Sequence, residues 1–116
     1  MPKQKIILDT SFLLTTLSFK VDIFSELNRI CDFEYEIYVL DKTLDELKGK
    51  KLGKIAEGVI KQKNIKIIKT DEGKVDELLL EQEGIIATQD IELKRLLKEK
   101  EKRIITIRQK RFLVLS

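Results

Sequence analysis

Two acidic residues each follow a short apolar run of the kind that forms a buried strand. Asp9 comes directly after Ile6-Ile7-Leu8, and Asp90 comes three residues after the end of Ile85-Ile86-Ala87. If the two runs are neighbouring strands of a parallel sheet, both carboxylates enter one crevice at the carboxyl edge of that sheet. Their negative charges would repel unless a cation or a shared proton neutralised them, which favours a cation site. A helix N-cap explains either acid equally well when it is taken alone.

Hydroxyl side chains flank both acids. Thr10 and Ser11 follow Asp9, and Thr88 precedes Asp90 by two positions. Hydroxyl groups in such places hydrogen-bond to carboxylates and orient them toward a bound ion. We therefore expect these three residues to support the acids.

A third acidic stretch lies within the helical pattern of residues 42–48. Its apolar stripe consists of Leu44 and Leu47, and periodicity alone directs neither Asp45 nor Glu46 toward a crevice. A solvated helix face explains both acids without any further role.

A fourth stretch, residues 73–83, offers one acid that borders an apolar face. Asp76 precedes Leu79 by three positions and Leu80 by four, which places it beside them on a helix. Asp76 is therefore the stronger functional candidate of this segment. Helix capping or a solvated charge explains it as well.

The residue types that are missing limit the catalytic mechanisms and metal sites that the chain can have. The chain has no histidine and a single cysteine. Serine–histidine and cysteine–histidine catalysis are therefore excluded, and so is a structural zinc site built from soft ligands. Catalysis would have to use carboxylates, hydroxyls, lysine, arginine or tyrosine.

Charged residues make up 37% of the chain, yet the formal net charge is only +3. So small a net charge neither requires nor excludes a nucleic-acid partner, and the distribution of the basic residues decides more. Solvated helix faces explain the basic clusters without any partner. The clusters comprise Lys48, Lys50, Lys51 and Lys54; Lys94, Arg95, Lys98, Lys100, Lys102 and Arg103; and Arg108, Lys110 and Arg111.

Short β-branched runs alternate with amphipathic stretches along the whole chain. This order predicts a single domain, residues 1–116, with the α/β fold of a three-layer α/β/α sandwich around a central parallel sheet of four to five strands. The expected strands are 5–8, 36–40, 65–69, 85–88 and 103–107, with 112–115 as a short edge strand. The expected helices are 11–17, 22–31, 42–48, 52–63, 73–83 and 91–99.

The apolar runs are far too short to span a bilayer. The N-terminal segment also lacks the apolar stretch of a secretory signal. We therefore expect a cytoplasmic protein with no membrane partner.

Four segments, taken in order, resemble the motifs of the PIN-domain family across nearly the whole chain. They are most similar to the archaeal and eukaryotic branch that is related to ribosomal-RNA-processing PIN proteins. The segments are Ile7–Leu14, Leu44–Leu47, Val75–Leu79 and Ile86–Leu93. Two positions depart from that branch: Val75 stands where a second Asp is common, and Gln89 stands where Asn is common.

The resemblance implies a PIN-like fold and a metal-dependent endoribonuclease that cleaves RNA phosphodiester bonds. The catalytic and metal-binding acids that it implies are Asp9, Glu46, Asp76 and Asp90, with Glu92 as an acid that assists. Carboxylate oxygens suit Mg²⁺ or Mn²⁺ as the cofactor. A pair of such ions can activate a water and stabilise the leaving oxygen during in-line attack. The basic residues expected to bind the backbone of single-stranded RNA are Lys48, Lys50, Lys51 and Lys54, which follow Glu46.

Other interpretations stay open. The resemblance implies a homodimer, for which Phe112–Leu115 offers an apolar contact. A catalytically weak RNA- or protein-binding module in ribosome assembly is an alternative function, and so is a toxin whose antitoxin partner covers the site. A receiver domain would need an adjacent acidic pair after the first strand, which the chain lacks. A haloacid-dehalogenase-type phosphatase would need an acid where Ser11 stands.

Overall fold

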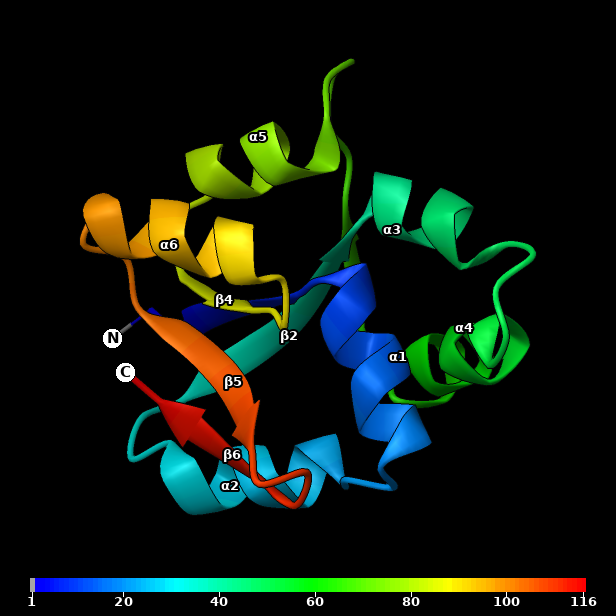
Figure 1. Cartoon of the computed structure of the whole chain (residues 1–116), viewed down its shortest axis with the longest axis horizontal. Helices are drawn as coiled ribbons and strands as arrows, with labels where there is room; N and C mark the ends of the chain where they lie inside the picture. The colour runs from blue at the N-terminus through cyan, green and yellow to red at the C-terminus, as the bar shows by residue number, and fades with distance from the viewer. Residues whose placement is uncertain (1) are drawn as a thin grey trace.

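The computed structural model describes residues 2–116, in which one sheet has the strand order β3-β2-β1-β4-β5-β6 (Figure 1). The strands are β1 (Gln4–Leu8), β2 (Tyr35–Leu40), β3 (Lys66–Ile68), β4 (Ile85–Ala87), β5 (Ile104–Arg108) and β6 (Phe112–Leu115). The helices are α1 (Thr10–Ser18), α2 (Ile23–Ile30), α3 (Asp41–Leu47), α4 (Gly53–Gln62), α5 (Val75–Glu81) and α6 (Ile91–Glu99). The predicted three-layer sandwich is confirmed. The sheet has six strands rather than four to five, because the short edge strand expected at 112–115 forms as β6. It is not wholly parallel, because β6 pairs antiparallel with β5.

Side chains alternate between the two faces of the sheet, as the twofold period of a strand requires. In β1, Ile6 and Leu8 pack into one apolar cluster, whereas Ile7 packs into the other. β4 alternates in the same way. Both faces of the central strands are therefore buried, which is why their sequences are continuously apolar.

Helices cover both faces of the sheet (Figure 1). On one face lie α1, α2 and α4, which contribute Phe12, Leu27 and Ile60 to the core. On the other lie α5 and α6, which contribute Leu79 and Leu93. Burial of large apolar side chains stabilises the fold by about 1.5–3 kcal/mol for each one that is fully removed from water.

The chain reverses its direction of progress across the sheet between β1 and β4. Strands β1 to β3 proceed outward on one side, after which β4 returns to pair with β1, and β5 and β6 continue on the other side. In open α/β sheets ligands bind beyond the carboxyl ends of the strands at such a switch point. The backbone N–H of Asp9, just past β1, donates to the carbonyl oxygen of Ala87 at 2.9 Å, which joins the two strand ends.

The close approach of β4 to β1 depends on Gly84. This residue has a φ of +115°, a conformation that favours glycine. A Cβ at this position would lie 2.6 Å from the backbone oxygen of Lys5 in β1. Gly84 does not end the preceding helix, because α5 ends at Glu81 with Gln82 as its C-cap. The close contact with β1 is the reason for glycine at this position.

The other predicted elements form with small shifts at their ends. The helix expected at residues 73–83 is shorter and runs Val75–Glu81, and the strand expected at 65–69 is Lys66–Ile68. Asp22 caps α2 by accepting hydrogen bonds from the N–H groups of Phe24 and Ser25 at 3.1 and 3.2 Å. Within residues 2–116 no helix has the length and apolar character needed to cross a membrane.

Side chains of α2 bond the outer edge of β6. The N–H of Leu113 donates to Oε1 of Glu26 at 2.8 Å, and Nη2 of Arg29 donates to the carbonyl oxygen of Leu113 at 2.9 Å. Leu113 itself is fully buried. The expectation that Phe112–Leu115 forms a dimer contact is therefore wrong for the buried part of this segment, which the chain uses as one of its own strands.

Glu26→Gln is expected to lower the free energy of unfolding by on the order of 1 kcal/mol at neutral pH, because the bond to Leu113 loses its charge. The hydrogen bond from Arg29 holds the pKa of Glu26 below its ordinary value of 4.5. This stabilisation is therefore complete above pH 4.5 and is lost as the pH falls through the lower folded pKa. Denaturant unfolding at neutral and acidic pH measures the effect. Equal stability of the two proteins at neutral pH would contradict it.

Candidate active site

Asp9 lies where β1 ends and α1 begins, and it is only 6% exposed. Its Oδ1 accepts a hydrogen bond from the N–H of Thr10 at 2.9 Å. Its Oδ2 accepts one from the hydroxyl of Ser11 at 2.9 Å and one from the hydroxyl of Thr88 at 2.7 Å. The supporting role predicted for Ser11 and Thr88 is confirmed. These donors satisfy the oxygens of a buried carboxylate, but all three are neutral and supply no opposite charge.

Asp90 lies on the other side of the switch point, where it begins α6. Its Oδ1 accepts a hydrogen bond from the N–H of Leu93 at 3.0 Å. Its own N–H donates to the hydroxyl oxygen of Thr88 at 3.1 Å. Thr88 therefore links the two acids, since its hydroxyl donates to Asp9 and accepts from Asp90. The helix-capping explanation is confirmed for each acid, and Thr88 joins the two acids at the ends of neighbouring strands. The cation site stays a prediction.

Glu46 joins the group from α3. The hydroxyl of Thr10 donates a short hydrogen bond to Oε1 of Glu46, which ties α3 to α1. The adjacent Asp45, about 100° further round the helix, pairs instead with Lys48 at 3.8 Å. The structure therefore separates two acids that periodicity could not distinguish, although both are exposed.

Asp76, in the first turn of α5, completes the group. Burial raises the pKa of its carboxyl, and so do three neighbouring negative charges, which belong to Asp90, Asp9 and Glu46. The order of the elements agrees with this influence: Asp9, Glu46, Asp76 and Asp90 each lie in the segment that follows the carboxyl end of β1, β2, β3 or β4. The four acids therefore lie toward one edge of the sheet. Within residues 2–116 none of the four forms an ion pair with a lysine or arginine.

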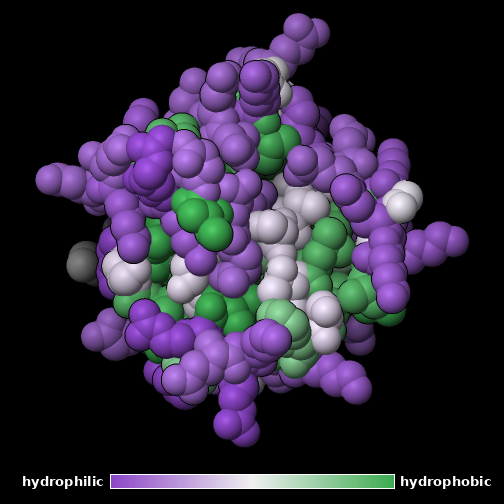
Figure 2. Space-filling view, in the orientation of Figure 1, coloured by the Kyte–Doolittle hydropathy of each residue, from purple (hydrophilic) through white to green (hydrophobic). Residues whose placement is uncertain are grey.

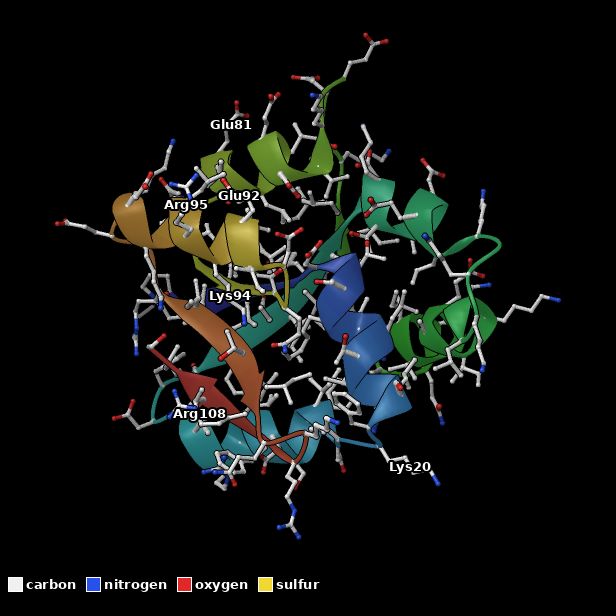
Figure 3. All side chains as sticks on the ribbon, in the orientation of Figure 1. Lys20, Glu81, Glu92, Lys94, Arg95 and Arg108 are labelled. Atoms are coloured by element: carbon white, nitrogen blue, oxygen red, sulfur yellow. The ribbon has the colours of Figure 1, made fainter. Side chains whose placement is uncertain are left out.

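Three other residues singled out from the sequence have structural roles. Glu92 pairs with Arg95 on the outer side of α6 (Figure 3), so the structure does not bring it into the group of four. The side-chain oxygen of Gln89 accepts a hydrogen bond from the N–H of Ile107 at 2.7 Å, which extends the pairing of β4 with β5. Val75 packs against the apolar cluster beneath α5 and α6.

One basic residue of α6 was not distinguished by the sequence. Lys94 follows Asp90 by four positions on α6, and its side chain extends toward β5 (Figure 3). Burial lowers the pKa of its ammonium group, and the charge of Lys98 lowers it further. The sequence signal for this partial burial was the position of Lys94 three residues before the buried Leu97, because neighbours at that spacing lie on one side of a helix.

The donor set suits a hard divalent cation. The four acids offer only oxygen ligands, which Mg²⁺ and Mn²⁺ prefer, and the chain contains no histidine to compete. Across the described residues, 2–116, no three acidic or cysteine side chains stand ready-made as a metal site. Some of the four side chains must therefore adjust before they can share an ion.

The surface beside these acids is mostly hydrophilic but carries an apolar strip. Figure 2 shows apolar and neutral residues along α1 toward α4, with hydrophilic residues on both sides. Two large apolar side chains in the first turns of helices are exposed: Ile91 of α6 by 83% and Ile55 of α4 by 55%. Such side chains are available for contact with another molecule.

Comparison with known proteins gives consistent matches. A family model described as a PIN like domain matches residues 6–110. Ribonuclease VapC4 of Methanocaldococcus jannaschii is 31% identical over 122 aligned positions, which cover 93% of this chain and 93% of that protein. The structure of the PIN domain endonuclease Utp24 superposes with a TM-score of 0.82 at 19% identity, over 97% of this chain and 90% of that one. At such low identity the second likeness shows the fold alone.

Asp76→Asn is expected to raise the melting temperature of the metal-free protein at neutral pH. The folded pKa of Asp76 lies above its ordinary value of 3.8, so its contribution to stability is complete below pH 3.8 and is lost as the pH rises through the folded value. The gain in the variant should accordingly disappear below pH 3.8. Thermal unfolding of the wild type and the variant in the presence of a chelator measures the difference in melting temperature.

The matched control for this prediction is Glu77→Gln, which changes an exposed acid of the same helix. Equal gains in the two variants would show that the effect comes from the net charge of α5 and not from the group of acids around Asp76.

Proposed function

Because this chain belongs to the PIN-domain family, we propose that it is an endoribonuclease whose active site consists of Asp9, Glu46, Asp76 and Asp90. The observation that supports the proposal is that four acids without a basic partner follow the carboxyl ends of β1 to β4, around the switch point of the sheet. The relative at 31% identity, which is named a ribonuclease, supports the same activity.

We infer that the four carboxylates hold Mg²⁺ or Mn²⁺. When bound, such an ion lowers the pKa of a water ligand and stabilises negative charge on the leaving oxygen of the phosphodiester. Asp9 is the ligand that needs least adjustment, because three donors already fix its carboxylate. Glu46 is exposed and tethered through Thr10, so its longer side chain can adapt.

Asp76 holds its proton more readily than a solvated aspartate does, because of burial and its three acidic neighbours. It gives that proton up when the surrounding negative charge is balanced. This property fits a carboxylate that becomes a ligand only when a cation is present.

We propose single-stranded RNA as the substrate. The exposed lysines that follow Glu46 along the chain are Lys48, Lys50, Lys51 and Lys54. Lysines bind phosphates as point charges and position a strand without reading its sequence. Precursor ribosomal RNA is one substrate to test, because of the motif resemblance described above.

Asp9→Asn and Asp90→Asn are each expected to lower the rate of RNA cleavage at least a hundredfold, because each removes a charged oxygen ligand without changing the shape of the side chain. Gel analysis of a labelled single-stranded RNA with Mn²⁺ or Mg²⁺ measures the rate. Glu92→Gln is the control, because Glu92 is an acid of α6 that pairs with Arg95 outside the site. If the wild type and both Asn variants cleave equally, a contaminant is responsible and the assignment fails.

Metal binding separates the nuclease from a catalytically weak module that only binds RNA or protein. Calorimetry with Mn²⁺ is expected to show binding at millimolar concentration or below in the wild type and weaker binding in Asp9→Asn. Heat release that is the same in both proteins would refute the four-acid site. An absence of binding in the wild type would favour the module.

We also propose a protein partner that covers the acids, as an antitoxin does, and the likeness to ribonuclease VapC4 supports this proposal. Co-expression with the neighbouring gene product tests it, since a covering partner should co-purify and suppress cleavage. Sedimentation of the purified chain tests the expected homodimer.

A further inference from the structure

The loop that joins α3 to α4 forms a pocket of about 600 Å³. This volume lies within the range of about 300–1,000 Å³ typical of sites for small organic ligands. The lining residues are Leu47, Lys48, Gly49, Lys50, Leu52, Lys54, Ile55 and Glu57. The pocket therefore combines an apolar lining with three lysines against one glutamate. In Figure 1 this loop lies at the end of α3 that is remote from the sheet.

The backbone fixes the shape of the pocket. Leu52 has a φ of 70°, a left-handed conformation that is uncommon for a branched side chain. The next residue is Gly53, where a Cβ would lie 2.0 Å from the carbonyl oxygen of Leu47. The start of α4 thus rests directly on the end of α3. Strained backbone of this kind persists where the surroundings hold it, and it often marks a binding loop.

The lysines of the pocket are available for a ligand. Throughout residues 2–116, Lys50 and Lys54 form no ion pair with any acid. Lys48 pairs only with Asp45, and both of those side chains are about three-quarters exposed, at 74% and 75%. A pair in this setting contributes little and is readily exchanged for another anion.

The apolar part of the lining is also accessible, because Ile55 is 55% exposed between the lysines. A ligand that fits must therefore present an apolar surface and negative charge within a few ångströms of each other. A nucleotide does so, since its base has apolar faces and its phosphates carry charge. Charge complementarity favours this occupant over an uncharged ligand.

We propose that the α3–α4 pocket binds one unstacked nucleotide of a single-stranded RNA, with the base against Leu52 and Ile55 and the adjoining phosphates on Lys50 and Lys54. The inference rests on the proposed function, because Glu46 directly precedes the lining residue Leu47 in the sequence. A strand with its scissile phosphate at the four acids would run past the end of α3 and reach the pocket.

Fluorescence anisotropy with a labelled oligouridylate, measured in chelator over a range of salt concentrations, tests the pocket apart from catalysis. The double variant Lys50→Gln/Lys54→Gln should reduce the slope of log affinity against log salt by about 0.7 for each phosphate that a lysine no longer neutralises. The control is Lys98→Gln/Lys100→Gln, which removes the same charge from the exposed C-terminal end of α6.

A separate variant tests the proposed contact between the base and Ile55. Ile55→Ser should weaken binding of oligouridylate roughly tenfold and leave binding of an abasic strand of equal length unchanged. Ile67→Ser is the matched control, because Ile67 is a similarly exposed isoleucine on β3, at 48%.

Equal slopes in the pocket and control double variants would overturn the proposal. So would an equal weakening of oligouridylate and abasic-strand binding by Ile55→Ser. Binding of polyglutamate, but not of RNA, in a manner that depends on Lys50 and Lys54 would instead indicate an acidic protein partner and overturn the nucleotide assignment. If RNA binds through the pocket yet is never cleaved with metal present, the proposed nuclease function fails while the pocket stands.

Discussion

The pairing of β1 with β4 is the constraint on which the site depends. The two strands can lie this close only because Gly84 lacks a side chain that would strike Lys5. Their adjacent ends then deliver Asp9 and Asp90 to one place, and a single hydroxyl, that of Thr88, bonds to both residues. The apolar core and the acidic site are therefore coupled, because a change in the register of these strands would separate the acids.

The four acids differ in how firmly the protein holds them. Asp9 has three hydrogen-bond donors, Asp90 caps a helix, and Glu46 accepts from Thr10. No side-chain hydrogen bond joins Asp76 to another residue in the part of the chain that the structure describes, and burial and neighbouring charge act on it instead. Asp9 and Asp90 are thus held firmly at the strand ends, whereas Glu46 and Asp76 on the helices can adjust.

The sequence was most informative where chemistry and periodicity coincide. Short apolar runs that alternate with amphipathic stretches predicted the sheet. The two acids that follow β1 and β4 were then predicted to lie at its carboxyl edge. Periodicity could not separate Glu46 from Asp45, because the difference between them is a hydroxyl on α1, far away in the chain. It also could not show that Gln89 bonds to β5, since that contact depends on how the two strands pack. The antiparallel turn into β6 was missed because a short apolar tail carries no signal of direction.

The two edges of the sheet limit how this domain can be recognised by other proteins. One edge, β3, has only three residues, and a lysine there is already paired with Glu36. At the other edge, side chains of α2 occupy the N–H and carbonyl of Leu113 in β6. Recognition by addition of an extended peptide needs free backbone groups along an edge. The short β3 and the occupied backbone of Leu113 leave little edge for such addition, so we expect recognition of this domain to use side chains on its helices and loops.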